Sequence, residues 1–185
     1  MLIRRAALAV LCAALTACTA PAAVTDATTT SDGAQTWPRG KRPTMPDLTG
    51  PTTDGRRLHL ADYKGHVIVL NAWATYCGPC RSEAPTLAHA QKTLAARGLQ
   101  VVGLNGGDNT ADAAAFIKDH RLGYPTLMDA KGRQALRMPR GTVSQSGLPY
   151  SVFIDRTGHI AATVIGAASE PDLKKITTPL LRERA

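Results

Sequence analysis

The sequence predicts an α/β fold built on one central sheet of mixed strand direction. Three features lead to it: an aliphatic run at 66–73 that is typical of a strand buried on both faces, a helical pattern directly after it, and an apolar hairpin at 150–165. Strand and helix alternate along the chain, as they do in α/β proteins. The 185 residues suit one such domain with an appendage.

The first predicted strand, 66–73, leads into a helix that ends near Gly98. The strand contains four consecutive aliphatic residues, V-I-V-L, which a sheet covered on both faces would bury. One face of the helix carries Leu87, Gln91 and Leu94, and glycine is a frequent helix stop.

The remaining elements follow in chain order. Residues 99–104 predict a second buried strand, and residues 110–120 predict a helix. Residues 150–155 and 159–165, separated by R-T-G, predict an antiparallel hairpin. A last helix is predicted over 169–181, where a serine stands at the capping position.

The composition excludes some classes of function. Hydrophobic residues make up 44% of the chain and charged residues 19%, which indicates a globular protein with a real core. The net charge is +8, but no run of five like charges occurs, and the chain has only two Phe, two Trp and four Tyr. Nucleic acid is therefore not expected as a partner. No internal repeat, G-x-G-x-x-G or G-x-x-x-x-G-K motif is present.

The first 17 residues predict a secretory signal peptide. Arg4 and Arg5 precede an apolar stretch at 6–15, and small residues follow it. This stretch is far shorter than the ~20 residues that a membrane-spanning helix needs.

The sequence L-T-A-C at 15–18 resembles a bacterial lipoprotein box. The resemblance implies cleavage before Cys18, attachment of lipid to its thiol, and a mature protein anchored to the outer face of the cell membrane. The alternative is that Cys18 lies by chance near an ordinary signal-peptidase site. Residues 18–43 are then expected to form an Ala/Thr-rich tether, and residues 44–185 the globular domain.

The chain has four cysteines, of which two remain for chemistry. Cys12 would leave with the signal peptide and Cys18 would carry lipid, so Cys77 and Cys80 remain, in the sequence C-G-P-C. A structural zinc site needs a second pair of ligands at similar spacing, and the histidines are scattered singly, so no metal is expected. A disulfide that closes so short a loop stabilises little, which favours a redox-active dithiol.

The cysteine pair is predicted to lie at the N-terminus of the first helix, because Pro79 suits a first helical turn. Free main-chain N–H groups and the helix dipole there stabilise an anion and lower the pKa of the first cysteine. Cys77 is therefore the predicted nucleophile. Cys80, one turn into the helix, is the predicted resolving thiol.

The segment N-A-W-A-T-Y-C-G-P-C-R-S-E-A-P at 71–85 resembles the active-site segment of thioredoxin-fold proteins, in particular the TlpA/ResA-like extracytoplasmic branch. The G-L-P at 147–149 and the V-F-I-D-R-T-G-H-I at 152–160 match the same branch. The resemblance covers about 44–181. It implies a thioredoxin fold, a central mixed sheet flanked by helices, with a helix–strand insertion at 110–138 and an N-terminal hairpin extension.

The resemblance also assigns residues around the cysteines. Pro149 matches a proline that is cis and faces the C-x-x-C, which would leave the Leu148 main chain free to pair with a substrate strand. Tyr76 stands beside the nucleophile, where it would shape the substrate surface or pack. Trp73 is expected in the core.

Other support is expected from Gly78 and Pro79 between the cysteines and from Glu83. Glu83 matches an acidic residue that ResA-like proteins hold near the active site, where it could tune thiol pKa values or move a proton. The alternative is an exposed first-turn glutamate favoured by the helix dipole. Asn71 stands where cytoplasmic thioredoxins carry a buried aspartate, so it cannot be a general base.

The predicted activity is thiol–disulfide exchange outside the cytoplasmic membrane, with no metal or organic cofactor. The resemblance implies protein disulfides as substrates, such as the haem-site cysteines of apocytochrome c, and a membrane thiol carrier of the CcdA type as electron donor. The Gly-Pro dipeptide is that of reducing thioredoxin and favours a reductase.

Three rivals differ from this interpretation. A disulfide-forming oxidase of the DsbE/DsbF kind is the nearest one, because fold is a poor guide to direction. A peroxiredoxin would have threonine and proline where Ala74 and Leu70 stand. A non-catalytic lipoprotein that binds partners would not need Cys77.

Overall fold

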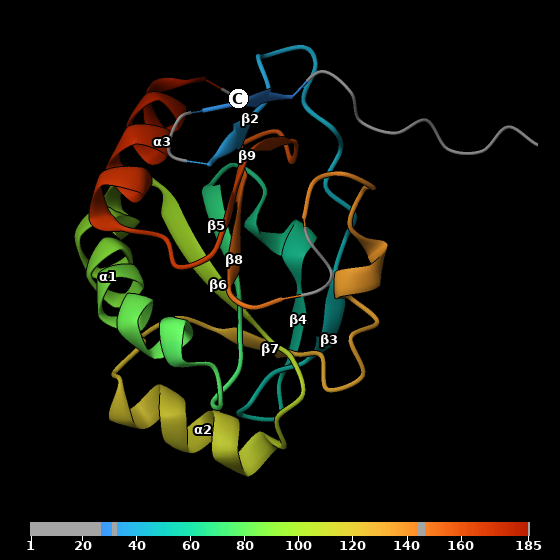
Figure 1. Ribbon diagram of the computed structural model, residues 1–185, viewed down its shortest axis with the longest axis vertical. Helices are drawn as coiled ribbons and strands as arrows, with labels where there is room; N and C mark the ends of the chain where they lie inside the picture. Colours follow the sequence, from blue (N-terminus) through green and yellow to red (C-terminus); the bar gives the residue numbers. More distant parts are fainter. Residues whose placement is uncertain (1–26, 31–32, 144–146, 185) are drawn as a thin grey trace, which may run out of the picture.

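The computed structural model describes residues 27–30, 33–143 and 147–184 (Figure 1). The predicted signal peptide, Cys12 and Cys18 lie outside the described residues. Within the described part, no helix is both long and apolar enough to cross a membrane.

A seven-stranded mixed sheet with the order β1-β2-β9-β8-β5-β6-β7 forms the centre of the fold. β5 pairs in parallel with β6 and antiparallel with β8, and β6 pairs in parallel with β7. The strands are β1 (Thr28–Thr29), β2 (Gln35–Thr36), β5 (Val67–Trp73), β6 (Leu99–Asn105), β7 (Thr126–Met128), β8 (Tyr150–Ile154) and β9 (Ile160–Ile165). All seven residues of β5 are buried, which confirms the strand predicted from the aliphatic run.

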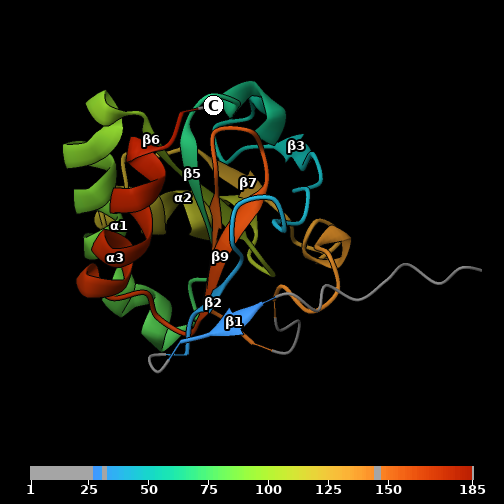
Figure 2. The ribbon, with the colours of Figure 1, turned by 90° about the horizontal axis from the view of Figure 1, so that it is seen from above.

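Three α-helices lie on one face of this sheet: α1 (Gly78–Leu94), α2 (Thr110–Asp119) and α3 (Glu170–Arg182) (Figures 1 and 2). Leu87 of α1, Phe116 of α2 and Ile176 of α3 share one apolar core with Val69 of β5. Ser169 caps α3 in a reciprocal capping box with Asp172, as the serine at this position predicted.

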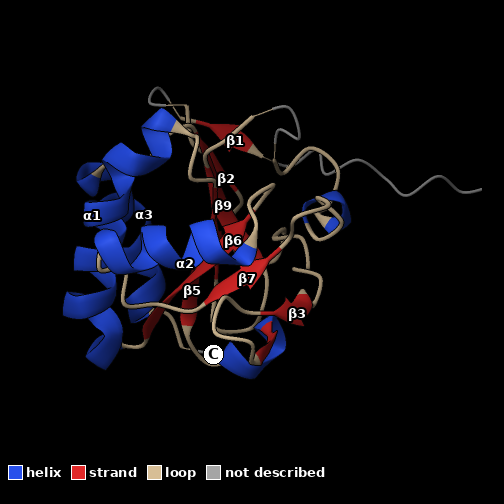
Figure 3. Ribbon diagram, turned by 90° about the horizontal axis from the view of Figure 1, so that it is seen from below, coloured by secondary structure: helices blue, strands red, loops and turns tan. Residues whose placement is uncertain are grey.

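The other face is covered without long helices (Figure 3). A hairpin of β3 (Thr49–Pro51) and β4 (Arg57–His59) leads into the short 3-10 helix η1 (Leu60–Tyr63). A second core lies here, in which Leu48 and Leu58 pack with Leu70 of β5. Two further short 3-10 helices lie elsewhere in the chain order: η2 (Ala95–Arg97) directly follows α1, and η3 (Ala135–Arg137) follows β7. The arrangement is the expected thioredoxin-like fold.

The domain begins earlier than the sequence indicated. Residues up to 43 were expected in a tether, but β2 pairs with β9, and Ala34 and Trp37 are buried. The Trp37 N–H donates to the Ala161 carbonyl at 2.9 Å. A strand joins a sheet through its main-chain hydrogen bonds, so the polar side chains of β2, Gln35 and Thr36, do not exclude it.

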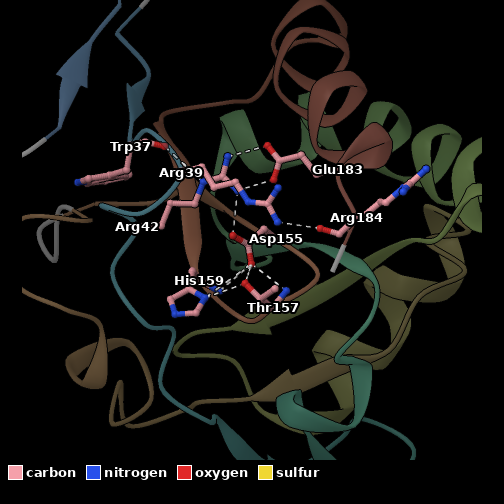
Figure 4. Close-up of polar contacts among 8 residues, drawn as sticks. All are labelled: Trp37, Arg39, Arg42, Asp155, Thr157, His159, Glu183 and Arg184. Atoms are coloured by element: carbon pink, nitrogen blue, oxygen red, sulfur yellow. Dashed lines mark hydrogen bonds and ion pairs between the residues drawn. The ribbon is translucent and has the colours of Figure 1, made fainter.

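A charged cluster fastens this N-terminal segment to the rest of the domain (Figure 4). Arg42 Nη1 lies 2.9 Å from Asp155 Oδ2 after β8 and 2.6 Å from Glu183 Oε2 at the end of α3. Burial raises the pKa of Asp155, but hydrogen bonds from Thr157 and Arg42 outweigh it and hold that pKa below its usual value. The Arg42 hydrogen bond likewise lowers the pKa of Glu183. Three distant parts of the chain therefore meet at one guanidinium.

Candidate active site

Cys77 and Cys80 form a disulfide at the first turn of α1. Cys77 is the N-cap residue, and its Sγ accepts a hydrogen bond from the Cys80 N–H at 3.2 Å. Cys77 is 8% exposed and Cys80 2%. A Cys77 thiolate formed on reduction would face the free N–H groups of the helix end, while Cys80 stays shielded.

The local sequence explains this placement. β5 ends at Trp73, and the Cys77 N–H donates to the Ala74 carbonyl at 3.2 Å, which closes a turn. Gly78 is the first residue of α1, and Pro79 follows in the first turn, where its missing N–H costs nothing. The buried strand β5 and the turn that follows it therefore fix the position of the nucleophile.

A groove of about 470 Å³ opens beside Cys77. Its lining includes Tyr76 and Pro79 on the helix side and Leu148 and Tyr150 on the β8 side. The Leu148–Pro149 peptide bond is cis, and Tyr150 pairs with Ala72, which brings the start of β8 beside the end of β5. Leu148, which is predicted to bind substrate, thus lines the same groove as Cys77.

The two aromatic residues before Cys77 differ in burial. Tyr76 is 72% exposed and lines the groove. Trp73 is 2% exposed and stacks on Phe116, with ring centroids 4.6 Å apart. Trp73 therefore lies in the core, as expected, and only Tyr76 is available to a substrate.

Glu83 is buried on the inner face of α1, so the alternative of an exposed first-turn glutamate is wrong. Its Oε1 accepts from Asn71 Nδ2 and its Oε2 from the Ala168 N–H, both at 2.7 Å. Burial raises the pKa of Glu83 to about 7, although these two hydrogen bonds oppose the shift. The carboxyl group can therefore exchange a proton near neutral pH.

Asn71 suits both protonation states of Glu83. It also donates to Ser151 Oγ at 3.2 Å. An amide offers Nδ2 to a carboxylate and, after a flip, Oδ1 to a carboxylic acid, whereas a carboxylate in its place would only repel an ionised Glu83. The departure from the aspartate of cytoplasmic thioredoxins thus moves the titratable group from β5 to α1.

Glu83→Gln is expected to change how stability depends on pH. Because the pKa of Glu83 is raised in the folded state, its contribution is present below the ordinary value of 4.5 and is lost as pH rises through about 7. The free energy of unfolding should fall over this interval in the wild type and fall less in the variant. Urea titrations at several pH values measure it. Glu170→Gln, at an exposed helix start, is the control; equal slopes in wild type and Glu83→Gln would contradict the prediction.

Sequence reasoning missed several buried polar residues around the site. Asp108, Asn105 and Ser151 are each less than a tenth exposed and lie near the cysteine turn. Asn105 ends a strand parallel to β5, and the ends of parallel strands meet at one edge of a sheet, which is the signal that could have found it. Within the described ranges, no three His, Cys, Asp or Glu residues form a group that could hold a metal ion.

Comparison with known proteins agrees with this geometry. The model of the AhpC/TSA family matches residues 42–163. Thiol-disulfide oxidoreductase ResA of Bacillus subtilis (strain 168) is 30% identical over 125 residues, which cover 68% of this chain and 67% of that protein.

Two solved structures are similar as well. A secreted thiol-disulfide isomerase from Corynebacterium glutamicum has a TM-score of 0.75 and 29% identity, covering 81% of this chain and 92% of that one. A DsbF homologue from Corynebacterium diphtheriae has a TM-score of 0.73 and 31% identity, covering 80% and 92%. The chain therefore belongs to the AhpC/TSA family of thioredoxin-fold proteins and, within it, is a ResA-like thiol-disulfide oxidoreductase.

Proposed function

We propose that this chain is a lipid-anchored, extracytoplasmic reductase of protein disulfides. The observation that carries the proposal is the placement of Cys77, at the N-cap of α1 and in a groove that is also lined by Leu148, the residue before cis Pro149. A helix N-terminus stabilises the attacking thiolate, and the groove provides room for a polypeptide beside it.

The reaction proceeds in two exchange steps. The Cys77 thiolate of the reduced protein attacks one sulfur of the substrate disulfide, and the other substrate sulfur leaves as a thiolate and takes up a proton. Cys80 then loses its proton and attacks Cys77 Sγ, which releases the second substrate thiol and leaves the Cys77–Cys80 disulfide. Two electrons pass from the protein to the substrate, and a donor must return them.

Glu83 is the proposed acceptor of the Cys80 proton. It lies one helical turn after Cys80, and both side chains are on the buried face of α1. A pKa of about 7 allows the carboxylate to take a proton at neutral pH and to release it later.

Leu148 is the proposed main-chain partner of the substrate. Among the residues the structure describes, none forms a hydrogen bond with the Leu148 N–H or carbonyl, although Gly166 donates to Pro149. An extended segment on either side of a substrate cysteine can therefore pair here as an added strand.

The proposed substrate is the pair of haem-site cysteines of apocytochrome c, with a membrane thiol carrier of the CcdA type as donor. The C-G-P-C segment and its flanks, which resemble the TlpA/ResA-like branch, support this assignment. Lipid on Cys18 would hold the domain beside a membrane donor.

A second candidate is a disulfide-forming oxidase for secreted proteins. The similarity to a DsbF homologue and to a secreted isomerase favours it. The same two cysteines would then accept electrons from folding proteins instead of donating them.

The reduction potential of the Cys77–Cys80 couple separates the two candidates. We expect a midpoint more negative than about −220 mV for the reductase, close to that of thioredoxin, and a value above about −150 mV for the oxidase. Equilibration with glutathione or dithiothreitol buffers measures it, in a chain whose Cys12 and Cys18 are replaced by serine. A value in the oxidase range would overturn the proposed direction.

A further inference from the structure

The loop that follows β6 holds the turn that carries Cys77. The Gly106 N–H donates to the Trp73 carbonyl at 3.0 Å. The Tyr76 hydroxyl lies over Gly107, about 3.1 Å from the place that a Cβ would occupy there. The residues before the nucleophile therefore rest on residues 105–108, which we name the support loop.

Asp108 makes the strongest of these contacts. One carboxylate oxygen accepts from the Thr75 N–H at 2.8 Å and from Asn105 Nδ2 at 2.6 Å. The other accepts from Thr75 Oγ1 at 2.7 Å. Asp108 is 7% exposed, and no cationic side chain among the described residues forms an ion pair with it. The Asp108 carboxylate is therefore a buried negative charge that is held by neutral donors. It binds Thr75, which lies two residues before Cys77 in the chain.

Thr75 is also held from its other side. Arg81 Nε donates to the Thr75 carbonyl at 3.1 Å, and the Arg81 guanidinium lies 5.7 Å from the centre of the Phe116 ring. Among the described residues, Asp112, Asp119 and His120 share the adjoining pocket with Thr75 and Arg81, and the Tyr76 hydroxyl lies over the support loop. Thr75 has its N–H, hydroxyl and carbonyl all bound, which leaves the turn little freedom.

Neutral acceptors could hold Thr75 equally well, as backbone carbonyls and asparagine do at many turns. A buried carboxylate without a cation costs free energy, so its charge is a feature to be explained. A negative charge near the sulfur raises the energy of the Cys77 thiolate and therefore of the reduced protein.

We propose that Asp108 is a positioning residue for the exchange reaction: it fixes the turn that presents Cys77, and its charge keeps the Cys77–Cys80 couple more reducing than the helix end alone would. The assignment holds whether the protein reduces or oxidises its substrates, because it concerns only the change that the Asp108 charge causes in the reduction potential of the couple.

Asp108→Asn tests the charge, and Asp155→Asn is the matched control. Asp155 is also 7% exposed and also accepts from the N–H and hydroxyl of a threonine, Thr157. It follows β8 at the far end of the sheet, where Ile154 pairs with Ile68 near the start of β5, whereas Cys77 follows the end of β5. Both variants remove one buried carboxylate charge and weaken one threonine turn, and only the Asp108 turn carries the nucleophile. Asp155→Asn also removes a partner of Arg42, which makes it the more severe change to the fold and therefore a stringent control for indirect effects on the couple.

The measurement is the equilibrium of the couple with glutathione, read from the redox state of the full chain with serine at Cys12 and Cys18. We expect Asp108→Asn to shift this equilibrium constant toward the reduced protein by ~3-fold or more, and Asp155→Asn to leave it unchanged. An unchanged constant in Asp108→Asn, or an equal shift in both variants, overturns the proposal.

Thr75 variants test the positioning separately, since they keep the charge. Thr75→Val removes the hydroxyl that Asp108 binds, and Thr75→Ser retains it. We expect the valine variant to exchange with a disulfide peptide several-fold more slowly than the wild type and the serine variant to recover most of that rate. Equal rates in the two variants would overturn the positioning role.

Discussion

Cys77→Ser is expected to lower thiol–disulfide exchange to the uncatalysed background, a loss of ~10³-fold or more, because the serine hydroxyl is not ionised at neutral pH and cannot form the mixed disulfide. Cys80→Ser should behave differently. Its Cys77 thiolate can still attack a substrate, but no second thiol releases the product, so a mixed disulfide should accumulate.

Non-reducing gels and mass spectrometry of membrane extracts would reveal the trapped species and identify its partner. The trap should be long-lived because an outside thiol must reach Cys77 to resolve it, and Cys77 is only 8% exposed. Cys77→Ser in the same cells is the control, because it should trap nothing. A functional Cys77→Ser protein would contradict the redox role and favour the binding lipoprotein instead.

Most of the fold could be predicted because its central elements are locally encoded. The aliphatic run of β5 has no polar position, so it had to lie between two covered faces, and the structure places it at the centre of the sheet. The C-G-P-C at the start of α1 and the serine at 169 mark helix starts by capping chemistry, which depends on a few neighbouring residues.

The parts that could not be predicted depend on contacts between distant residues. Whether Glu83 faces water or the core depends on Asn71 and on Ala168, which is 85 positions further along the chain. The pairing of β2 with β9 is likewise a main-chain contact, and the side chains of β2 do not predict it. Asp108 belongs to no sequence motif. Its contact with the cysteine turn follows only from the parallel pairing that brings the ends of β5 and β6 side by side.

Removing the Arg42 side chain is expected to give the largest loss of stability, ~3–5 kcal/mol of unfolding free energy, because it leaves Asp155 buried without its cation. The Arg42 and Asp155 side chains are each 9% exposed, and Glu183 is 25% exposed, which places the expected loss nearer the lower value. Urea unfolding of the oxidised protein at neutral pH measures it. Arg56→Ala is the control: Arg56 pairs with Asp54, but these side chains are 79% and 52% exposed and the pair is solvated, so its loss of stability should be small beside that of Arg42→Ala.

Acid should weaken the same cluster of Arg42, Asp155 and Glu183. Asp155 and Glu183 have lowered pKa values in the folded state, so their contribution to stability is present above the ordinary carboxyl range and is lost as pH falls through the folded values. Arg42→Ala removes a hydrogen-bond donor that lowers both pKa values, and its stability should therefore decrease less steeply on acidification than that of the wild type. Parallel curves for the two proteins would mean that Arg42 acts by packing alone. Arg42→Lys, which keeps the charge but loses the forked contact to Glu183, should lie between them.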